Sequence, residues 1–88
     1  MVKKRLKVRI PCGIHLKPAG ILANAASKYD AYSYIQYKNN NINAKSVLNL
    51  VACGILAGDE VTLQCTGRDE SKAIIAMQTV LQDESIRA

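Results

Sequence analysis

The apolar residues of this chain change their spacing several times along its length, and this change limits the possible folds more than any other feature. Leu6, Val8 and Ile10 alternate with cationic residues, which is typical of a half-buried strand. Alternating and helical spacings predict strands over 5–10, 31–37, 42–43 and 60–66, and helices over 16–28, 46–53 and 69–84. The order β-α-β-β-α-β-α predicts an α+β fold, a four-stranded, mainly antiparallel sheet with helices on one face.

The length of 88 residues suits one domain, and we expect a single domain over 1–88. No apolar stretch reaches the roughly 18 residues of a membrane-spanning helix, and no apolar leader core follows the charged N-terminus. Cys12, Cys53 and Cys65 are odd in number and widely spaced, which argues against a disulfide framework. We therefore expect a cytoplasmic protein without membrane insertion.

The formal net charge of +5 suits either a nucleic acid or an acidic protein partner. Tyr32 and Tyr34 on a predicted strand would allow stacking on bases, as in an RNA-binding α/β domain. The sequence has no ribonucleoprotein motif and neither Phe nor Trp, so we expect no nucleic-acid partner. Cys12 and His15 form an isolated C-x-x-H without a second ligand pair, so we expect no metal site and no cofactor.

Pro18 fixes the start of the first predicted helix. Proline fits a helix only in the first turn, where backbone N–H groups lack partners, so the helix begins at about residue 15 or 16. His15, the only histidine, then lies at or just before the N-cap. Gly13 allows the preceding loop to turn tightly.

A histidine at this position lies where an anion would bind. The start of a helix presents free N–H groups and the positive end of the dipole. Lys17 in the first turn is disfavoured by the same dipole, which is easier to explain if an anion binds there. A neutral imidazole is nucleophilic at cytosolic pH without an activating base, so His15 can accept a phosphoryl group. The alternative is that His15 only caps the helix.

The sequence closely resembles the histidine-containing phosphocarrier (HPr) family of the bacterial sugar phosphotransferase system. The resemblance is strongest at 13–19 (GIHLKPA) and continues at 26–31 (ASKYDA), 43–48 (NAKSVL), 53–55 (CGI) and 57–61 (AGDEV). It implies an open-faced β-sandwich with three helices over one face of the sheet. Two positions depart from the usual family residues. Lys17 replaces an arginine, and Cys12 stands where serine or asparagine is common.

The resemblance implies that His15 is phosphorylated on Nδ1 by enzyme I, which is itself charged from phosphoenolpyruvate. His15 would then pass the group to histidines of sugar-specific enzyme IIA domains. Lys17 would stabilise the phosphate as a point charge, without the bidentate geometry of arginine. The chain would be a monomeric carrier with a phosphohistidine intermediate rather than an independent enzyme.

The resemblance also assigns a regulatory role to Ser46, which matches a serine phosphorylated by HPr kinase/phosphorylase in many Gram-positive bacteria. Phosphoserine there can recruit a transcriptional regulator or inhibit transport. The family's partner-docking surface corresponds to Gly20, Ile21, Val47, Leu48 and Val51. A phosphate on Ser46 would add about two negative charges beside this surface. Two alternatives remain: a diverged paralogue that acts mainly as a regulatory binding module through Ser46, and an ordinary N-cap serine.

Overall fold

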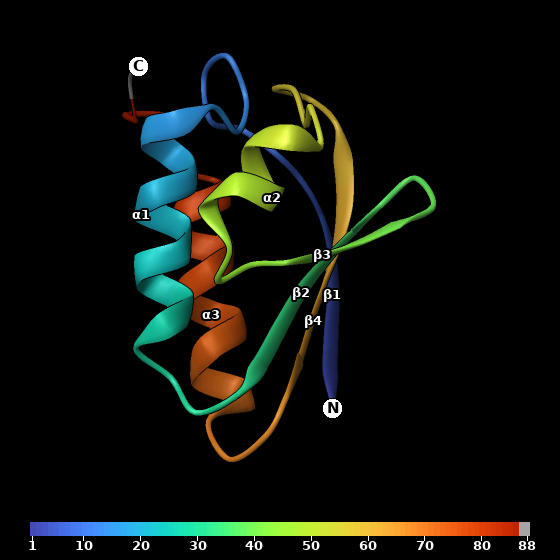
Figure 1. The fold of residues 1–88 in the computed structure, drawn as a ribbon, viewed down its shortest axis with the longest axis vertical. Coiled ribbons are helices and arrows are strands. Elements are labelled where there is room, and N and C mark those ends of the chain that lie inside the picture. Colours follow the sequence, from blue (N-terminus) through green and yellow to red (C-terminus); the bar gives the residue numbers. More distant parts are fainter. Residues whose placement is uncertain (87–88) are drawn as a thin grey trace.

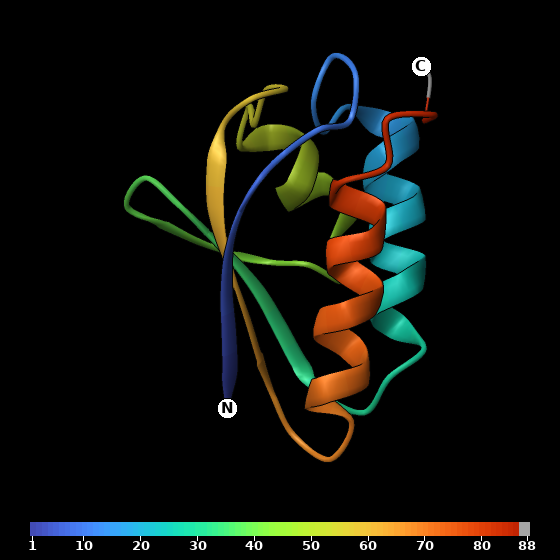
Figure 2. The ribbon, with the colours of Figure 1, turned by 180° about the vertical axis from the view of Figure 1, so that it is seen from behind.

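The computed structural model describes residues 1–86 and places three helices on one face of a four-stranded sheet (Figures 1 and 2). The predicted order β-α-β-β-α-β-α is confirmed. The elements are β1 (Val2–Lys7), α1 (Leu16–Ser27), β2 (Tyr32–Tyr37), β3 (Asn40–Asn43), α2 (Val47–Ala52), β4 (Glu60–Thr66) and α3 (Glu70–Leu81). None of the helices within 1–86 is long and apolar enough to cross a bilayer.

The sheet has the strand order β1-β4-β2-β3, and every neighbouring pair is antiparallel. β4 pairs with β1 on one side and with β2 on the other, so β1 and β3 form the two edges. Ile35 of β2 lies opposite Leu63 of β4 and Ile42 of β3. All three side chains are buried, which places them on the face that the helices cover.

The helices bury apolar residues that lie at helical spacing along the sequence. α1 and α3 pack against each other, and α3 also contacts the sheet. The buried helical residues are Pro18, Ala19, Leu22, Ala23 and Ala26 of α1, Leu50 of α2, and Ala73, Met77 and Leu81 of α3. Met77 is core filler, as expected, with its sulfur 3.7 Å from that of Cys65.

β1 begins and ends earlier than the predicted range of 5–10. The alternation does continue beyond the strand, because Val8 and Ile10 are both buried. The Arg9 amide, however, donates to the Leu81 carbonyl at 2.9 Å. Val8 still exchanges two backbone hydrogen bonds with Gly58 and Asp59 just before β4, and only from Arg9 does the chain turn toward the end of α3.

Two further boundaries differ from the sequence-based prediction by two residues or more. α3 ends at Leu81 rather than at 84, and β3 begins at Asn40, which pairs with Tyr37. In the hairpin between β2 and β3 the left-handed backbone falls on Lys38, with φ of 54°, although asparagine tolerates this region more readily. The Lys38 ammonium lies 5.2 Å from the Tyr37 ring centroid, a contact that offsets part of this cost.

A hydrogen bond between Tyr37 and Asp59 ties the end of β2 to the loop before β4. The Tyr37 hydroxyl donates to Asp59 Oδ2 at 2.6 Å, and the Leu56 amide donates to the same oxygen at 3.0 Å. The bond from Tyr37, followed by that from Leu56, lowers the pKa of Asp59. The bond to Asp59 likewise raises the pKa of Tyr37. The ionised carboxylate is therefore the form that the folded loop favours.

We expect Tyr37→Phe to reduce the loss of stability on acidification. Because the folded state lowers the pKa of Asp59, its contribution is present above the pKa of the unfolded chain and is lost as the pH falls below about 4. Urea unfolding between neutral and acidic pH should show a shallower decline for Tyr37→Phe than for the unsubstituted protein. Tyr34→Phe is the control, and a decline equally shallow in both variants would rule out this role for Tyr37.

Candidate functional site

The loop before α1 is held in place where the backbone at Gly13 and Ile14 lies close to the backbone at Ile55. The Ile14 amide donates to the Ile55 carbonyl at 2.9 Å. Gly13 has a φ of 78°, and a Cβ atom at this position would overlap the Ile55 carbonyl oxygen and the Leu56 Cα atom. Only glycine therefore fits, both for its backbone conformation and for the space available. This contact fixes the start of α1 against the loop before β4.

His15 is the N-cap residue of α1, as predicted. Its backbone is extended, with φ of −95° and ψ of −168°, and its carbonyl accepts from the Ala19 amide at 2.9 Å. The side chain makes no capping hydrogen bond. The geometry therefore gives no support to the alternative in which the His15 side chain serves only as a helix cap.

The two ring nitrogens of the half-buried His15 have different environments. Nε2 is buried and has no hydrogen-bond partner within residues 1–86, whereas Nδ1 is not among the buried atoms. A buried ring nitrogen without a partner is costly, and such groups occur at functional sites more often than elsewhere. Nδ1 is thus the less enclosed of the two ring nitrogens.

The first turn of α1 supplies positive charge beside this ring. The amides of Leu16 and Lys17 have no intrahelical acceptor, and Pro18 has no amide hydrogen. The turn contains no acidic residue, and the Lys17 side chain is exposed. An anion on His15 would therefore meet free N–H groups, the helix dipole and an ammonium group.

Ser46 is the N-cap of α2, and its Oγ accepts from the Asn49 amide at 3.3 Å. The ordinary capping role that the sequence allowed is therefore present. Figure 1 shows α2 beside the N-terminal half of α1, and the two helices are in contact. Ser46 thus begins a helix that packs next to the one His15 begins.

The residues expected to form a docking surface differ in exposure. Leu48 is 80% exposed, and Ile21 and Val51 are exposed at 37% and 38%. Val47 packs partly against the core, and Gly20 is half-buried, so these two contribute less apolar surface than the sequence suggests. The exposed side chains of Leu48, Ile21 and Val51 are nevertheless apolar, and packing within the protein does not account for them.

Two exposed leucines near His15 escaped the sequence analysis. Leu16, which follows His15 directly, is 68% exposed, and Leu56, whose backbone touches Gly13, is 61% exposed. Leu56 lies in a loop, where no periodic pattern reveals which way a side chain points. We use the name apolar face for the exposed side chains of Leu16, Ile21, Leu48, Val51 and Leu56.

Within residues 1–86 no cluster of three or more metal-ligating side chains is found. The three cysteines are free thiols. Cys12 is exposed and has a φ of 67°, a region that costs a non-glycine residue about 1 kcal/mol. It therefore adds strain to the loop that carries His15.

We expect Gly13→Ala to destabilise the protein by about 3 kcal/mol or more, because the methyl group would overlap backbone atoms at a left-handed position. Gly20→Ala is the matched comparison. A Cβ atom there meets nothing within 4 Å, so the substitution should stabilise α1 by about 0.5–1 kcal/mol. Urea unfolding measures the change in unfolding free energy in both variants. A Gly13→Ala protein that loses no more stability than Gly20→Ala would contradict the close approach at Gly13.

A model of the family described as the PTS HPr component phosphorylation site matches residues 2–83. HPr from Bacillus anthracis str. Ames is 27% identical, with a TM-score of 0.88 over 92% of this chain and 96% of that one. A histidine-containing phosphocarrier protein from Mycoplasma is 33% identical, with a TM-score of 0.84 over 90% of each chain.

The catabolite repression containing protein Crh from Bacillus subtilis, solved as a swapped dimer, is 28% identical, with a TM-score of 0.77 over 99% of this chain and 100% of that one. The family match spans most of the sequence, and the three solved structures have the same fold as this chain. The chain therefore belongs to the HPr family of phosphocarrier proteins of the phosphotransferase system.

Proposed function

We propose that this chain carries a phosphoryl group in the phosphoenolpyruvate-dependent sugar phosphotransferase system of the cytoplasm. It would accept the group from enzyme I on His15 and pass it to enzyme IIA domains. The observation that carries the proposal is a half-buried N-cap histidine whose side chain makes no capping bond and whose Nδ1 is less enclosed than its Nε2. Membership of a phosphocarrier family supports the same assignment.

The transfer needs no activating base in this geometry. The Nδ1 lone pair of a neutral His15 attacks the phosphorus of the phosphohistidine on enzyme I. The new N–P bond forms as the donor N–P bond breaks, and the donor imidazole leaves with the electron pair of that bond. The free amides at the start of α1 and the Lys17 ammonium then balance the added charge. The reverse sequence of bond changes delivers the group to enzyme IIA.

The apolar face is the proposed docking surface for both partners, together with the partly buried Gly20 and Val47. Its exposed leucines lie at the first residue of α1, on α2, which packs against α1, and in the loop next to Gly13. Grouped apolar side chains on a small protein commonly mark an interaction site. The exposed Lys17 in the first turn of α1 would favour partners with acidic rims.

Regulation through Ser46 is a second candidate function, favoured by the similarity to Crh. Ser46 begins α2, so a phosphate would place negative charge beside Leu48 and the rest of the apolar face. That charge would oppose acidic carriers and would suit a different partner, such as a transcriptional regulator.

Incubation with ATP and HPr kinase/phosphorylase separates the two roles. Acid-stable phosphate on Ser46 supports regulation, and an adduct only on His15 argues against it.

We expect one acid-labile phosphoryl group on His15 when enzyme I and phosphoenolpyruvate are supplied. Intact-mass measurement at alkaline pH detects the adduct, and brief acidification should remove it. His15→Ala should abolish the adduct and keep the fold, because the imidazole caps nothing in α1. An adduct that survives in His15→Ala, or none in the unsubstituted protein with a matched enzyme I, would refute the carrier role.

We expect Leu48→Ser to lower kcat/KM for phosphoryl transfer from enzyme I by about tenfold, because it removes a highly exposed apolar contact. Ile75→Ser is the matched control, since Ile75 is 63% exposed on α3, outside the apolar face. Steady-state kinetics with enzyme I as the varied substrate measures both. Equal loss in the two variants would show that the apolar face has no special part in docking.

A further inference from the structure

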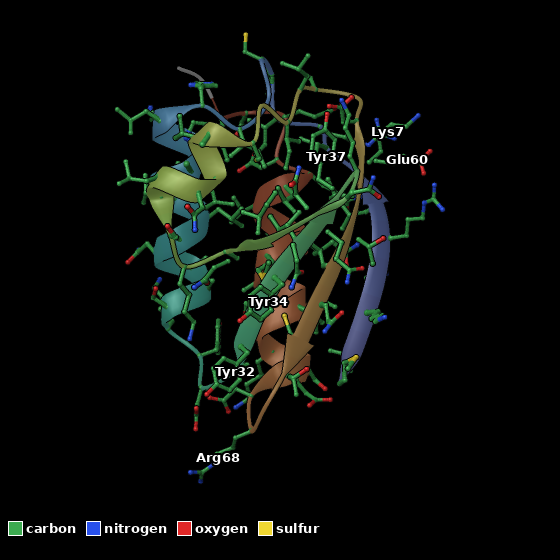
Figure 3. The ribbon with its side chains drawn as sticks, turned by 45° about the vertical axis from the view of Figure 1, so that its right-hand side comes forward. Lys7, Tyr32, Tyr34, Tyr37, Glu60 and Arg68 are labelled. Carbon is green, nitrogen blue, oxygen red and sulfur yellow. The ribbon has the colours of Figure 1, made fainter. Side chains whose placement is uncertain are left out.

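The face of the sheet that points away from the helices is uncovered, as Figure 3 shows. The buried residues of β2 and β4 alternate with residues that point to the opposite side. We call that side the open face, and its members are Lys3, Arg5, Lys7, Tyr32, Tyr34, Gln36, Asn41, Asn43, Glu60, Thr62, Gln64 and Thr66. No aliphatic side chain is among them, so the open face does not suit a hydrophobic partner.

Cations occupy one edge of the open face. Lys3, Arg5 and Lys7 follow one another at every second position of β1, about 7 Å apart. Arg5 pairs with Glu60 at 2.8 Å, and Glu60 is the one acidic side chain of the open face. Lys3 and Lys7 have no ion-pair partner within residues 1–86. Their charges are available to an external anion.

Tyrosines lie on the open face two strands away from these cations. The register places Lys3 opposite Gln64 and Gln64 opposite Tyr34, so the row from lysine to tyrosine spans about 10 Å. Tyr32 is 73% exposed, and Tyr34 is half-buried two residues further along β2. Figure 3 shows the two tyrosines in line on β2, with Lys7 beyond one end and Arg68 beyond the other.

A hollow of about 250 Å³ adjoins the exposed tyrosine. It is lined by Asp30, Ala31, Tyr32, Lys45, Thr66 and Gly67. The hollow combines an aromatic wall with polar backbone and one lysine, and Asp30 is its one acidic residue. A planar polar ring stacked on Tyr32 would have room to enter it.

We propose that the open face binds single-stranded nucleic acid. Phosphates would lie along the cations of β1, bases would stack on Tyr32 and Tyr34, and the Gln64 amide would lie between them, within reach of base edges. An acidic polypeptide would satisfy the lysines and leave the tyrosine rings without a partner, so the observations favour a ligand that carries both anions and flat rings. The sequence alone led us to expect no nucleic-acid partner. The strand register adds that the tyrosines share one face of the sheet with Gln64 and the cations of β1.

This surface lies on the opposite side of the sheet from α1 and α2, so the proposal goes beyond the carrier function and does not compete with it. The charge on β1 has a simpler use as well, since lysines on an edge strand hinder pairing with other sheets. That use does not require exposed aromatic rings on β2. The tyrosines therefore decide between the two explanations.

The test titrates the full chain into a fluorescein-labelled oligouridylate of about 12 nucleotides and follows anisotropy at several salt concentrations. Tyrosine emission gives a second readout, because the protein has four tyrosines and no tryptophan. We expect binding that weakens with salt and quenches tyrosine. Tyr32→Ala with Tyr34→Ala should weaken binding about tenfold or more with an unchanged salt slope, and Tyr32→Ala alone should show the same direction if the double variant is unstable.

Lys3→Gln with Lys7→Gln should weaken binding and reduce the slope of log affinity against log salt by about 0.7 per removed contact. The matched control is Lys28→Gln with Lys72→Gln on the helical side, which should leave affinity nearly unchanged. Three outcomes would overturn the proposal: no binding at micromolar protein in low salt, equal loss in the control, or equally tight binding of polyglutamate with no effect of the tyrosine substitutions. Phosphorylation of His15 by enzyme I should persist in every variant, so failure here is distinct from failure of the carrier role.

Discussion

The placement of His15 depends on the contact between the Gly13 loop and the Ile55 carbonyl. Gly13 has a left-handed backbone and no space for a Cβ atom, and the adjacent Ile14 amide bonds to Ile55. The loop before β4, which contains Ile55, is held in turn by Asp59. The Asp59 carboxylate accepts hydrogen bonds from the Leu56 amide and from the Tyr37 hydroxyl. The start of α1 is therefore braced by β2 and by the loop before β4, and the imidazole does not need a capping bond to be oriented.

Two surfaces with different chemistry result from this architecture. The apolar face lies on α1, which begins after His15, on α2 and in the loop next to Gly13. The open face of the sheet is polar, cationic and aromatic, and it contains no aliphatic side chain. Because the sheet separates the two, a ligand on one does not sterically block the other (Figure 2). A protein of this size can thus offer two binding surfaces of opposite character.

Much of the fold follows from local patterns, and much of the site does not. Pro18 located the start of α1 because its ring is tolerated only in the first turn, and the burial of Leu22 and Ala26 followed from helical spacing. The early end of β1 is accompanied by a tertiary bond from the Arg9 amide to the Leu81 carbonyl, which no periodicity encodes. The burial of Nε2 in His15 likewise arises from packing around the ring, so the sequence could place the residue and not distinguish its two nitrogens.

The difference between the two nitrogens is the central claim, and nitrogen-15 and phosphorus-31 NMR test it most directly. The protein, labelled with nitrogen-15 in its one histidine, is phosphorylated at alkaline pH with phosphoenolpyruvate and a catalytic amount of enzyme I. One-bond nitrogen–phosphorus coupling identifies the atom that carries the phosphoryl group. The structure predicts coupling to Nδ1, the ring nitrogen that is not buried. Coupling to Nε2 would contradict the proposed approach to the ring.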